Sequence, residues 1–183
     1  MKSRMKNKGF MMVDEQYDSA AQIWYKSDLK SNRMEREKLY GAIFEYLESH
    51  KTLALATGYA SQIRNTPVDY AFHDGAFWIF SEGGEKFVGL KENKNVALTV
   101  FDDFQDWRKL RGLQANGVAS VYLPGAKEYV RAAKMRGLDP EKIGGLEHPL
   151  YLIKVVPSKI TFTNAEFKND GYAMRQNYEF KEN

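Results

Sequence analysis

Apolar residues in the first part of the chain recur at helical spacing. Tyr17, Ala20, Ala21 and Trp24 fall at intervals of three and four positions and would share one face of a helix. This pattern predicts a short helix within an N-terminal arm, residues 1–30. We expect the arm to precede a single larger domain, residues 31–183.

A second apolar stripe follows the arm. Leu39, Ile43 and Leu47 repeat at intervals of four and predict an amphipathic helix that ends at Ser49. Asn32 stands three residues before Glu35, which is the spacing of a capping box at a helix start. The first element of the larger domain is therefore expected to be a helix.

After Ser49 the apolar pattern changes from helical to alternating, which indicates β-strands. Asp74 and Gly75 are typical of a tight hairpin turn. Helical stretches are expected at 86–93 and 125–136. The β-rich runs are 52–59, 63–72, 76–81, 96–101, 113–122, and the pair 151–156 and 159–163 on either side of Pro157. Seven β-rich runs with a few helices approximate the inventory of a closed, mostly antiparallel barrel of six strands.

Composition narrows the functional classes. No apolar run approaches the roughly 20 residues that span a bilayer, so we expect no membrane insertion. The chain has no cysteine, which excludes disulfides and thiol chemistry and favours a cytoplasmic location. The net charge is +3, and acidic residues alternate with the basic ones, so nucleic acid is not an expected partner. A small anionic ligand is compatible with this balance.

Several chemistries lack their motifs. His50, His73 and His148 show no metal-binding spacing, so no metal site is expected. The chain contains neither the Gly-x-Ser-x-Gly of serine hydrolases nor the Gly-x-Gly-x-x-Gly of dinucleotide-binding folds. The adjacent carboxylates Asp102 and Asp103 are interpreted as a solvated turn.

Four short motifs, in order, resemble a known family over residues 34–163. The motifs are Leu-Ala-Leu-Ala-Thr at 53–57, Arg-Asn-Thr-Pro-Val at 64–68, Asp-Gly-Ala-Phe-Trp-Ile-Phe-Ser at 74–81, and Lys86 with Leu90 and Asn93 before 96–100. The chain thereby resembles the pyridoxamine 5'-phosphate oxidase-like FMN-binding split β-barrel proteins. The resemblance implies a mainly β (α+β) fold, a six-stranded antiparallel split β-barrel with flanking helices, over residues 31–183.

The resemblance also implies a cofactor, FMN, and a homodimer that holds it between subunits. An FMN site needs cations for the phosphate and apolar walls for the ring. In similar proteins the strand that corresponds to Arg64, Asn65, Thr66, Pro67 and Val68 lies along the flavin. Phe80 and Ser81 would end the next strand near it, and Lys86 would meet the phosphate. The partner subunit would contribute Trp107, Arg111 and Gln114, and the catalytic residues stay unknown.

Each of these residues also has a plain structural explanation. Arg64 and Lys86 can be solvated surface charges, Phe80 can belong to the core, and Pro67 can be an edge-strand proline. Trp107 can be an interface aromatic.

The motifs depart from true pyridoxamine-phosphate oxidases. Asp69 stands where those enzymes carry a lysine for the substrate's phosphate, and its carboxylate would repel that group. Glu85 replaces a cation of the phosphate loop, and Thr163 replaces a tryptophan on the flavin side. Oxidation of pyridoxamine phosphate is therefore not expected.

Three functions follow from the sequence. The first is an FMN-dependent oxidoreductase acting on an unidentified small-molecule substrate. The alternatives are a haem-binding or haem-degrading split-barrel protein, for which His148 is the candidate axial ligand, and a non-enzymatic flavin-binding protein.

Overall fold

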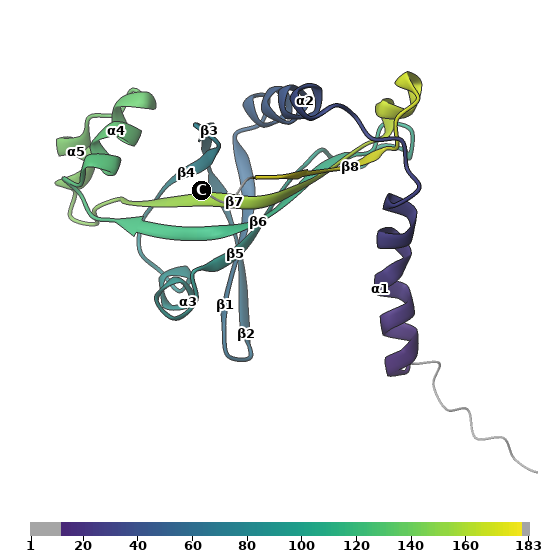
Figure 1. The fold of residues 1–183 in the computed structure, drawn as a ribbon. Coiled ribbons are helices and arrows are strands. Elements are labelled where there is room, and N and C mark those ends of the chain that lie inside the picture. Colours follow the sequence, from purple (N-terminus) through teal and green to yellow (C-terminus); the bar gives the residue numbers. More distant parts are fainter. Residues whose placement is uncertain (1–11, 181–183) are drawn as a thin grey trace, which may run out of the picture. The chain divides into compact units, whose positions relative to one another are not determined.

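The computed structural model describes residues 12–180. The chain divides after Asn32 into two units, each described here by itself. In the first unit, helix α1 (Asp14–Asp28) carries the apolar stripe expected for the arm, and none of its side chains is buried. The second unit, from Arg33, contains the sheet and the remaining helices (Figure 1).

The second unit is built around one antiparallel sheet. Its helices are α2 (Arg36–Glu48), α3 (Lys86–Glu92), α4 (Lys127–Met135) and α5 (Pro140–Gly144), with a 3-10 helix, η1 (Ala165–Asp170). Its strands are β1 (Thr52–Tyr59), β2 (Gln62–Asp69), β3 (Ala71–His73), β4 (Ala76–Ser81), β5 (Asn95–Phe101), β6 (Arg111–Tyr122), β7 (Tyr151–Asn164) and β8 (Arg175–Glu179).

The strand order is β2-β1-β5-β6-β7-β4-β3, with β8 also paired to β7. Strand β7 is long enough to have two partners on one side: β4 pairs with its first half and β8 with its second half. The sheet curls, because β2 and β4, far apart in the pairing order, come into contact. The fold class expected from the sequence is thus confirmed, with eight strands rather than six.

The curled sheet encloses the main hydrophobic core. Inward-facing residues of β1, β5, β6 and β7 pack together, and α2 covers one end of the core with Leu39, Ile43 and Leu47. Strand β4 is buried along its whole length. Its residues Phe77 and Ile79 face the main core, whereas Trp78 and Phe80 face α4 in a second cluster. Helix α4 therefore accounts for the absence of an inside–outside alternation in β4.

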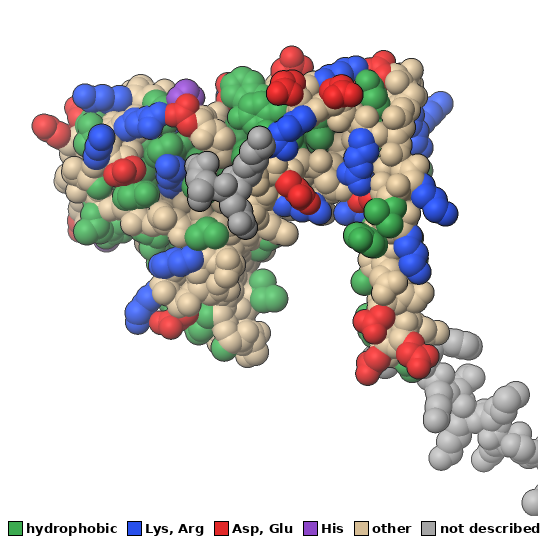
Figure 2. Space-filling model, viewed as in Figure 1, with side chains coloured by type: hydrophobic (Ala, Val, Ile, Leu, Met, Phe, Trp, Pro, Cys, Tyr) green, Lys and Arg blue, Asp and Glu red, His purple; other side chains and the backbone are tan. Residues whose placement is uncertain are grey.

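On β1, β5 and β6 the outer face of the sheet carries no charged side chain, whereas the next strand, β7, places Lys159 beside Asn116 on that face. Its positions on β1, β5 and β6 alternate with the core residues and include Ala56, Ala97 and Asn116, which are cross-strand neighbours. Elsewhere on the visible side of this unit, Lys and Arg side chains are interspersed with Asp and Glu (Figure 2). None of the described helices is long and apolar enough to span a membrane.

Three boundary predictions were wrong in detail. Helix α2 begins after Glu35, so Asn32 is not its cap, and no side chain caps this helix start. The run 63–72 is two strands, because Tyr70 breaks the ladder and donates its backbone N–H to Lys51 O at 3.1 Å. The runs on either side of Pro157 form one continuous strand, β7.

Two turn features follow the sequence closely. The β3–β4 hairpin turns at Asp74 and Gly75, both with positive φ, as a tight type I′-like turn requires. Opposite Pro157, the ladder between β6 and β7 shifts register at Asn116 and Gly117. A side chain at Gly117 would place its Cβ 2.5 Å from Val156 O and 3.0 Å from Pro157 Cα.

We expect Gly117→Ala to destabilise the fold by about 1 to 3 kcal/mol, the usual cost of overpacking. The closest atom, Val156 O, belongs to the backbone of β7, so no side-chain rotation can relieve the clash. The matched control is Gly41→Ala in α2, where a Cβ meets nothing within 4 Å. It should stabilise by about 0.5 to 1 kcal/mol through helix propensity. Urea unfolding measures both, and a Gly117→Ala protein as stable as Gly41→Ala would contradict the close approach.

Candidate functional site

A cleft opens where β2 and β4 approach each other. Its volume is about 590 Å³, and it is bounded by β2, the end of β4, the start of α3, and the segment after α4. Six of the residues expected to bind the cofactor line it: Thr66, Pro67, Val68, Phe80, Ser81 and Lys86. The fold thus brings together positions from three motifs that are separate in the sequence.

Lys86 is the most unusual residue of the cleft. It opens α3 and is only 8% exposed. Its ammonium donates to Gly83 O at 2.7 Å and forms no ion pair with a carboxylate of the described chain. Burial lowers the pKa of Lys86, and the neighbouring charge of Arg64 lowers it further, while Glu82 acts in the opposite direction. A buried cation without a carboxylate partner is costly unless an anion compensates it.

Two threonine hydroxyls, on β1 and β2, are buried without a hydrogen-bond partner in the described chain. Thr66 Oγ1 belongs to a residue that lines the cleft, on β2. Thr57 Oγ1, on β1, belongs to a residue of a smaller pocket of about 270 Å³. Arg64 also lines this smaller pocket and forms an ion pair with Glu85. Because buried hydroxyls are normally satisfied, these two are candidates for bonds to a ligand.

An ion pair lies at the other end of the cleft. Asp69, at the end of β2, is paired with Arg136, which follows α4, and both residues line the cleft. The Arg136 side chain is 23% exposed, so this guanidinium largely compensates the Asp69 carboxylate. The electrostatic repulsion expected from Asp69 alone is therefore reduced. Leu138 and Leu150 provide apolar wall nearby.

The remaining predicted residues lie outside this cleft. Asn65 points from β2 to the outer side of the sheet, as its pairing with Ala56 requires. Gln114 is exposed on the outer face of β6. Trp107 is 75% exposed on the loop between β5 and β6, where it contacts Phe104 edge to face. Within one subunit, these residues do not meet the six that line the cleft.

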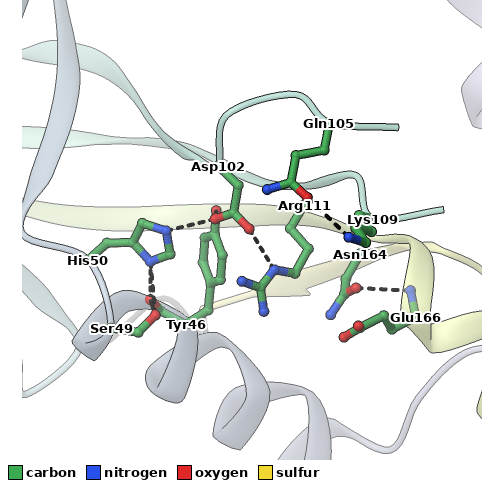
Figure 3. Close-up of polar contacts among 9 residues, drawn as sticks. All are labelled: Tyr46, Ser49, His50, Asp102, Gln105, Lys109, Arg111, Asn164 and Glu166. Carbon is green, nitrogen blue, oxygen red and sulfur yellow. Dashed lines mark hydrogen bonds and ion pairs between the residues drawn. The ribbon is translucent and has the colours of Figure 1, made fainter. Parts of the chain in front are cut away.

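Arg111 belongs to a second polar cluster, shown in Figure 3. Asp102 is its centre and accepts hydrogen bonds from Arg111 Nε at 2.7 Å and from Tyr46 Oη at 3.1 Å. His50 Nε2 lies 2.8 Å from the same carboxylate, and His50 Nδ1 lies 2.7 Å from Tyr46 O. The cluster thus joins the end of α2 to both ends of the β5–β6 loop.

Burial by itself would raise the pKa of Asp102. The hydrogen bonds from Arg111, His50 and Tyr46 outweigh burial and hold the pKa of this carboxyl below its usual value. The same neighbourhood raises the pKa of Tyr46, through burial first and the Asp102 charge second. Asp102 is therefore a partly buried, fully engaged carboxylate, and its interpretation as a solvated turn was wrong.

Sequence reasoning missed Arg136, Leu138, Leu150 and the cluster around Asp102. No sequence motif marks Arg136, because it reaches the cleft only when the segment after α4 lies beside the end of β2. Asp102 and His50 are fifty-two positions apart, and only the tertiary fold brings the segment after α2 to the base of the β5–β6 loop. Among the described residues, no three or more His, Asp or Glu side chains are placed to hold a metal ion.

Comparisons with known proteins support the architecture. No family model and no curated protein matches the sequence. Among solved structures, ChuZ from Campylobacter jejuni is similar, with a TM-score of 0.61 and 18% identity over 92% of this chain and 70% of ChuZ. The haem storage protein HutZ from Vibrio cholerae has a TM-score of 0.54 and 20% identity over 68% of this chain and 91% of HutZ.

An FAD-binding protein from Mesorhizobium loti matches with a TM-score of 0.53 and 16% identity, over 72% of this chain and 94% of its own. Putative pyridoxamine 5'-phosphate oxidases are among the further matches. The chain has the pyridoxamine 5'-phosphate oxidase-like split-barrel fold. At these identities the similarity establishes the split barrel, and the ligand has to be argued from the cleft itself.

The lowered pKa of Asp102 makes its contribution to stability pH-dependent. A carboxyl whose folded-state pKa lies below the unfolded value of about 3.9 stabilises the fold above that pH, and the stabilisation disappears as the pH falls through the folded-state pKa. We expect Asp102→Asn to lose about 1.5 to 3 kcal/mol of unfolding free energy near neutral pH. The difference from wild type should shrink in strongly acidic buffer. Urea unfolding across a pH series checks this, and a pH-independent difference would contradict the ionised hub.

Proposed function

We propose that the protein is an FMN-binding flavoprotein that acts as an oxidoreductase on a small-molecule substrate. The observation that supports this most directly is Lys86, a buried ammonium that faces the cleft region without a carboxylate partner. A phosphate dianion would compensate Lys86 and would share the Arg64 guanidinium with Glu85, its present ion-pair partner. The unpartnered hydroxyl of Thr66 offers one further hydrogen bond.

The other walls of the cleft fit a flat, largely apolar ring. Val68, Phe80, Leu138 and Leu150 contribute apolar surface, and the cleft volume of about 590 Å³ lies within the usual range for cofactor sites. When bound, the flavin would supply the electron transfer. The residues of this chain would hold its phosphate at Lys86, orient the ring along β2, and exclude water from one side of it.

The proposal includes a homodimer with cofactor shared between subunits. The outer face of β1, β5 and β6 carries no charged side chain, and on β5 and β6 it is largely exposed in the single subunit, including Ala97 and Val118. Gln114 lies on this face, and Trp107 lies on the loop beyond β5. A second copy on this face would bury it and place both residues near the partner's cleft. A cytoplasmic location, expected from the cysteine-free composition, completes the proposal.

Haem binding is the alternative suggested by the similarity to HutZ, which is described as a haem storage protein. His148, the candidate axial ligand, is exposed in the segment before β7 and is not among the residues that line the cleft. The visible spectrum of the purified protein separates the two, since flavin and haem absorb differently.

We expect Lys86→Ala to weaken FMN binding by about 1.5 to 3 kcal/mol, the scale of a charge-assisted hydrogen bond. Arg64→Ala should weaken it similarly, and riboflavin, which lacks the phosphate, should bind wild type more weakly than FMN. The matched control is Lys91→Ala on the same helix, because the Lys91 side chain is 82% exposed. Isothermal titration provides the dissociation constants. Equal affinity for FMN and riboflavin, or equal losses in the Lys86 and Lys91 variants, would refute the phosphate site.

The dimer is tested at Ala97, in the middle of the uncharged face. We expect Ala97→Arg to shift the protein from dimer to monomer in sedimentation at low micromolar concentration, because it would bury an unpaired charge in the interface. Glu147→Arg, in the segment before β7, introduces the same guanidinium away from the sheet and should leave the dimer intact. A wild-type monomer that binds FMN tightly would show instead that one subunit suffices.

A further inference from the structure

The polar cluster around Asp102 lies at the base of the β5–β6 loop, residues 102–110, which we call the aromatic loop. Asp102 is the first residue after β5, and Arg111 is the first residue of β6. Their side chains are bonded at 2.7 Å, and Asp102 N donates to Arg111 O at 3.3 Å. The two ends of the loop are therefore closed by a side-chain bond and a backbone bond together.

Residues at and just after the end of α2 also bind the carboxylate that closes the loop. Tyr46 and His50, one turn apart near the end of α2, both reach the Asp102 carboxylate. The Tyr46 ring is itself fixed in the core, 4.8 Å from the ring of Phe162 on β7. One carboxylate thus binds three side chains, from α2, from the segment just after it, and from the start of β6 (Figure 3).

The rest of the aromatic loop is ordered by its own hydrogen bonds. Asp106 accepts from the backbone N–H of Arg108 at 2.7 Å, and Lys109 N donates to Asp106 O at 3.1 Å. At the loop tip, Phe104 and Trp107 contact each other at 5.3 Å, and both are more than half exposed. The loop therefore presents a preformed pair of aromatic rings to the outside, on a base fixed by Asp102.

We propose that Asp102 is a positioning residue, which acts through Arg111, His50 and Tyr46 to hold the aromatic loop in the conformation that carries Trp107 to the partner subunit. The last part rests on the proposed shared cofactor site. An exposed aromatic pair on a flexible loop would lose conformational freedom on docking, and an ordered base removes most of this cost beforehand. Loss of the Asp102 charge weakens the side-chain bonds to Arg111, His50 and Tyr46 at once and leaves the backbone bond between Asp102 N and Arg111 O as the remaining closure of the loop.

The absence of cysteine from the chain makes a direct measurement of loop order practical. In an Arg108→Cys protein, a nitroxide spin label at this one thiol reports the motion of the loop tip, where the Arg108 side chain is 91% exposed. The label is compared in three backgrounds: wild type, Asp102→Asn and Asp103→Asn. Asp103→Asn is the matched control, because Asp103 is the adjacent carboxylate, is exposed, and undergoes the same Asp-to-Asn substitution.

We expect the immobilised component of the spectrum to persist in wild type and in Asp103→Asn and to be lost in Asp102→Asn. FMN affinity should fall about tenfold in Asp102→Asn and remain unchanged in Asp103→Asn. An immobilised label in folded Asp102→Asn, or equal mobilisation in both variants, would overturn the inference. A mobilised loop with unchanged FMN affinity would overturn the positioning role and leave the proposed FMN function standing.

A second pair of variants covers the case in which Asp102→Asn does not fold. His50→Ala removes one donor to Asp102 and should mobilise the label, while His50→Gln retains an amide donor at a similar reach and should restore part of the order. Equal spectra for these two variants would overturn the role of the cluster. If wild type binds no FMN, the proposed function and the cofactor part of this inference both fail, and the spectra still decide whether Asp102 holds the loop.

Discussion

The pairing of β6 with β7 is the interaction on which the rest of the structure depends. The ladder runs from the pair Arg111 and Asn164 to the pair Tyr122 and Leu152, along the whole length of β6. Because β7 is longer than any of its neighbours, it pairs with β4 at one end and β8 at the other. This arrangement directs the β3–β4 hairpin back toward β2 and so creates the cleft. The register shift at Gly117 adjusts the ladder where Pro157 interrupts it.

The cleft and the cluster around Asp102 differ in how their buried charges are compensated. The Asp102 carboxylate is bonded to Arg111, His50 and Tyr46, which stabilises the fold without a ligand. Lys86 is a buried cation whose ammonium donates a hydrogen bond to a carbonyl oxygen, Gly83 O. The positive charge of Arg64 disfavours its charged state further. Structural polar networks are normally satisfied internally. The cleft around Lys86 is therefore the better candidate for ligand binding. The cluster around Asp102 is the better candidate for fixing the geometry of the loop.

The sequence predicted elements well wherever local pattern decides them. Strand β1 follows from alternation, the Asp74–Gly75 hairpin from turn chemistry and helix α3 from helical spacing, and the motifs placed Thr66, Phe80 and Lys86 on elements that line the cleft. It failed where tertiary contacts decide. Pro157 reads as a break between two strands, yet the opposite bulge lets β7 continue. Arg136 and the Asp102 cluster depend on packing between distant segments, which no local pattern records.

An open seam in a barrel exposes strand edges, and this chain protects both ends of its sheet in different ways. Strand β2 carries Pro67, which has no N–H to offer to an incoming strand, and Arg64 adds an exposed charge on the same strand. At the other end, β3 spans only Ala71–His73, which is too short a template for stable pairing. Pro67 also lines the cleft. Pro67 therefore has two effects. It forms part of the cleft wall, and it discourages a second chain from pairing with the exposed edge of β2.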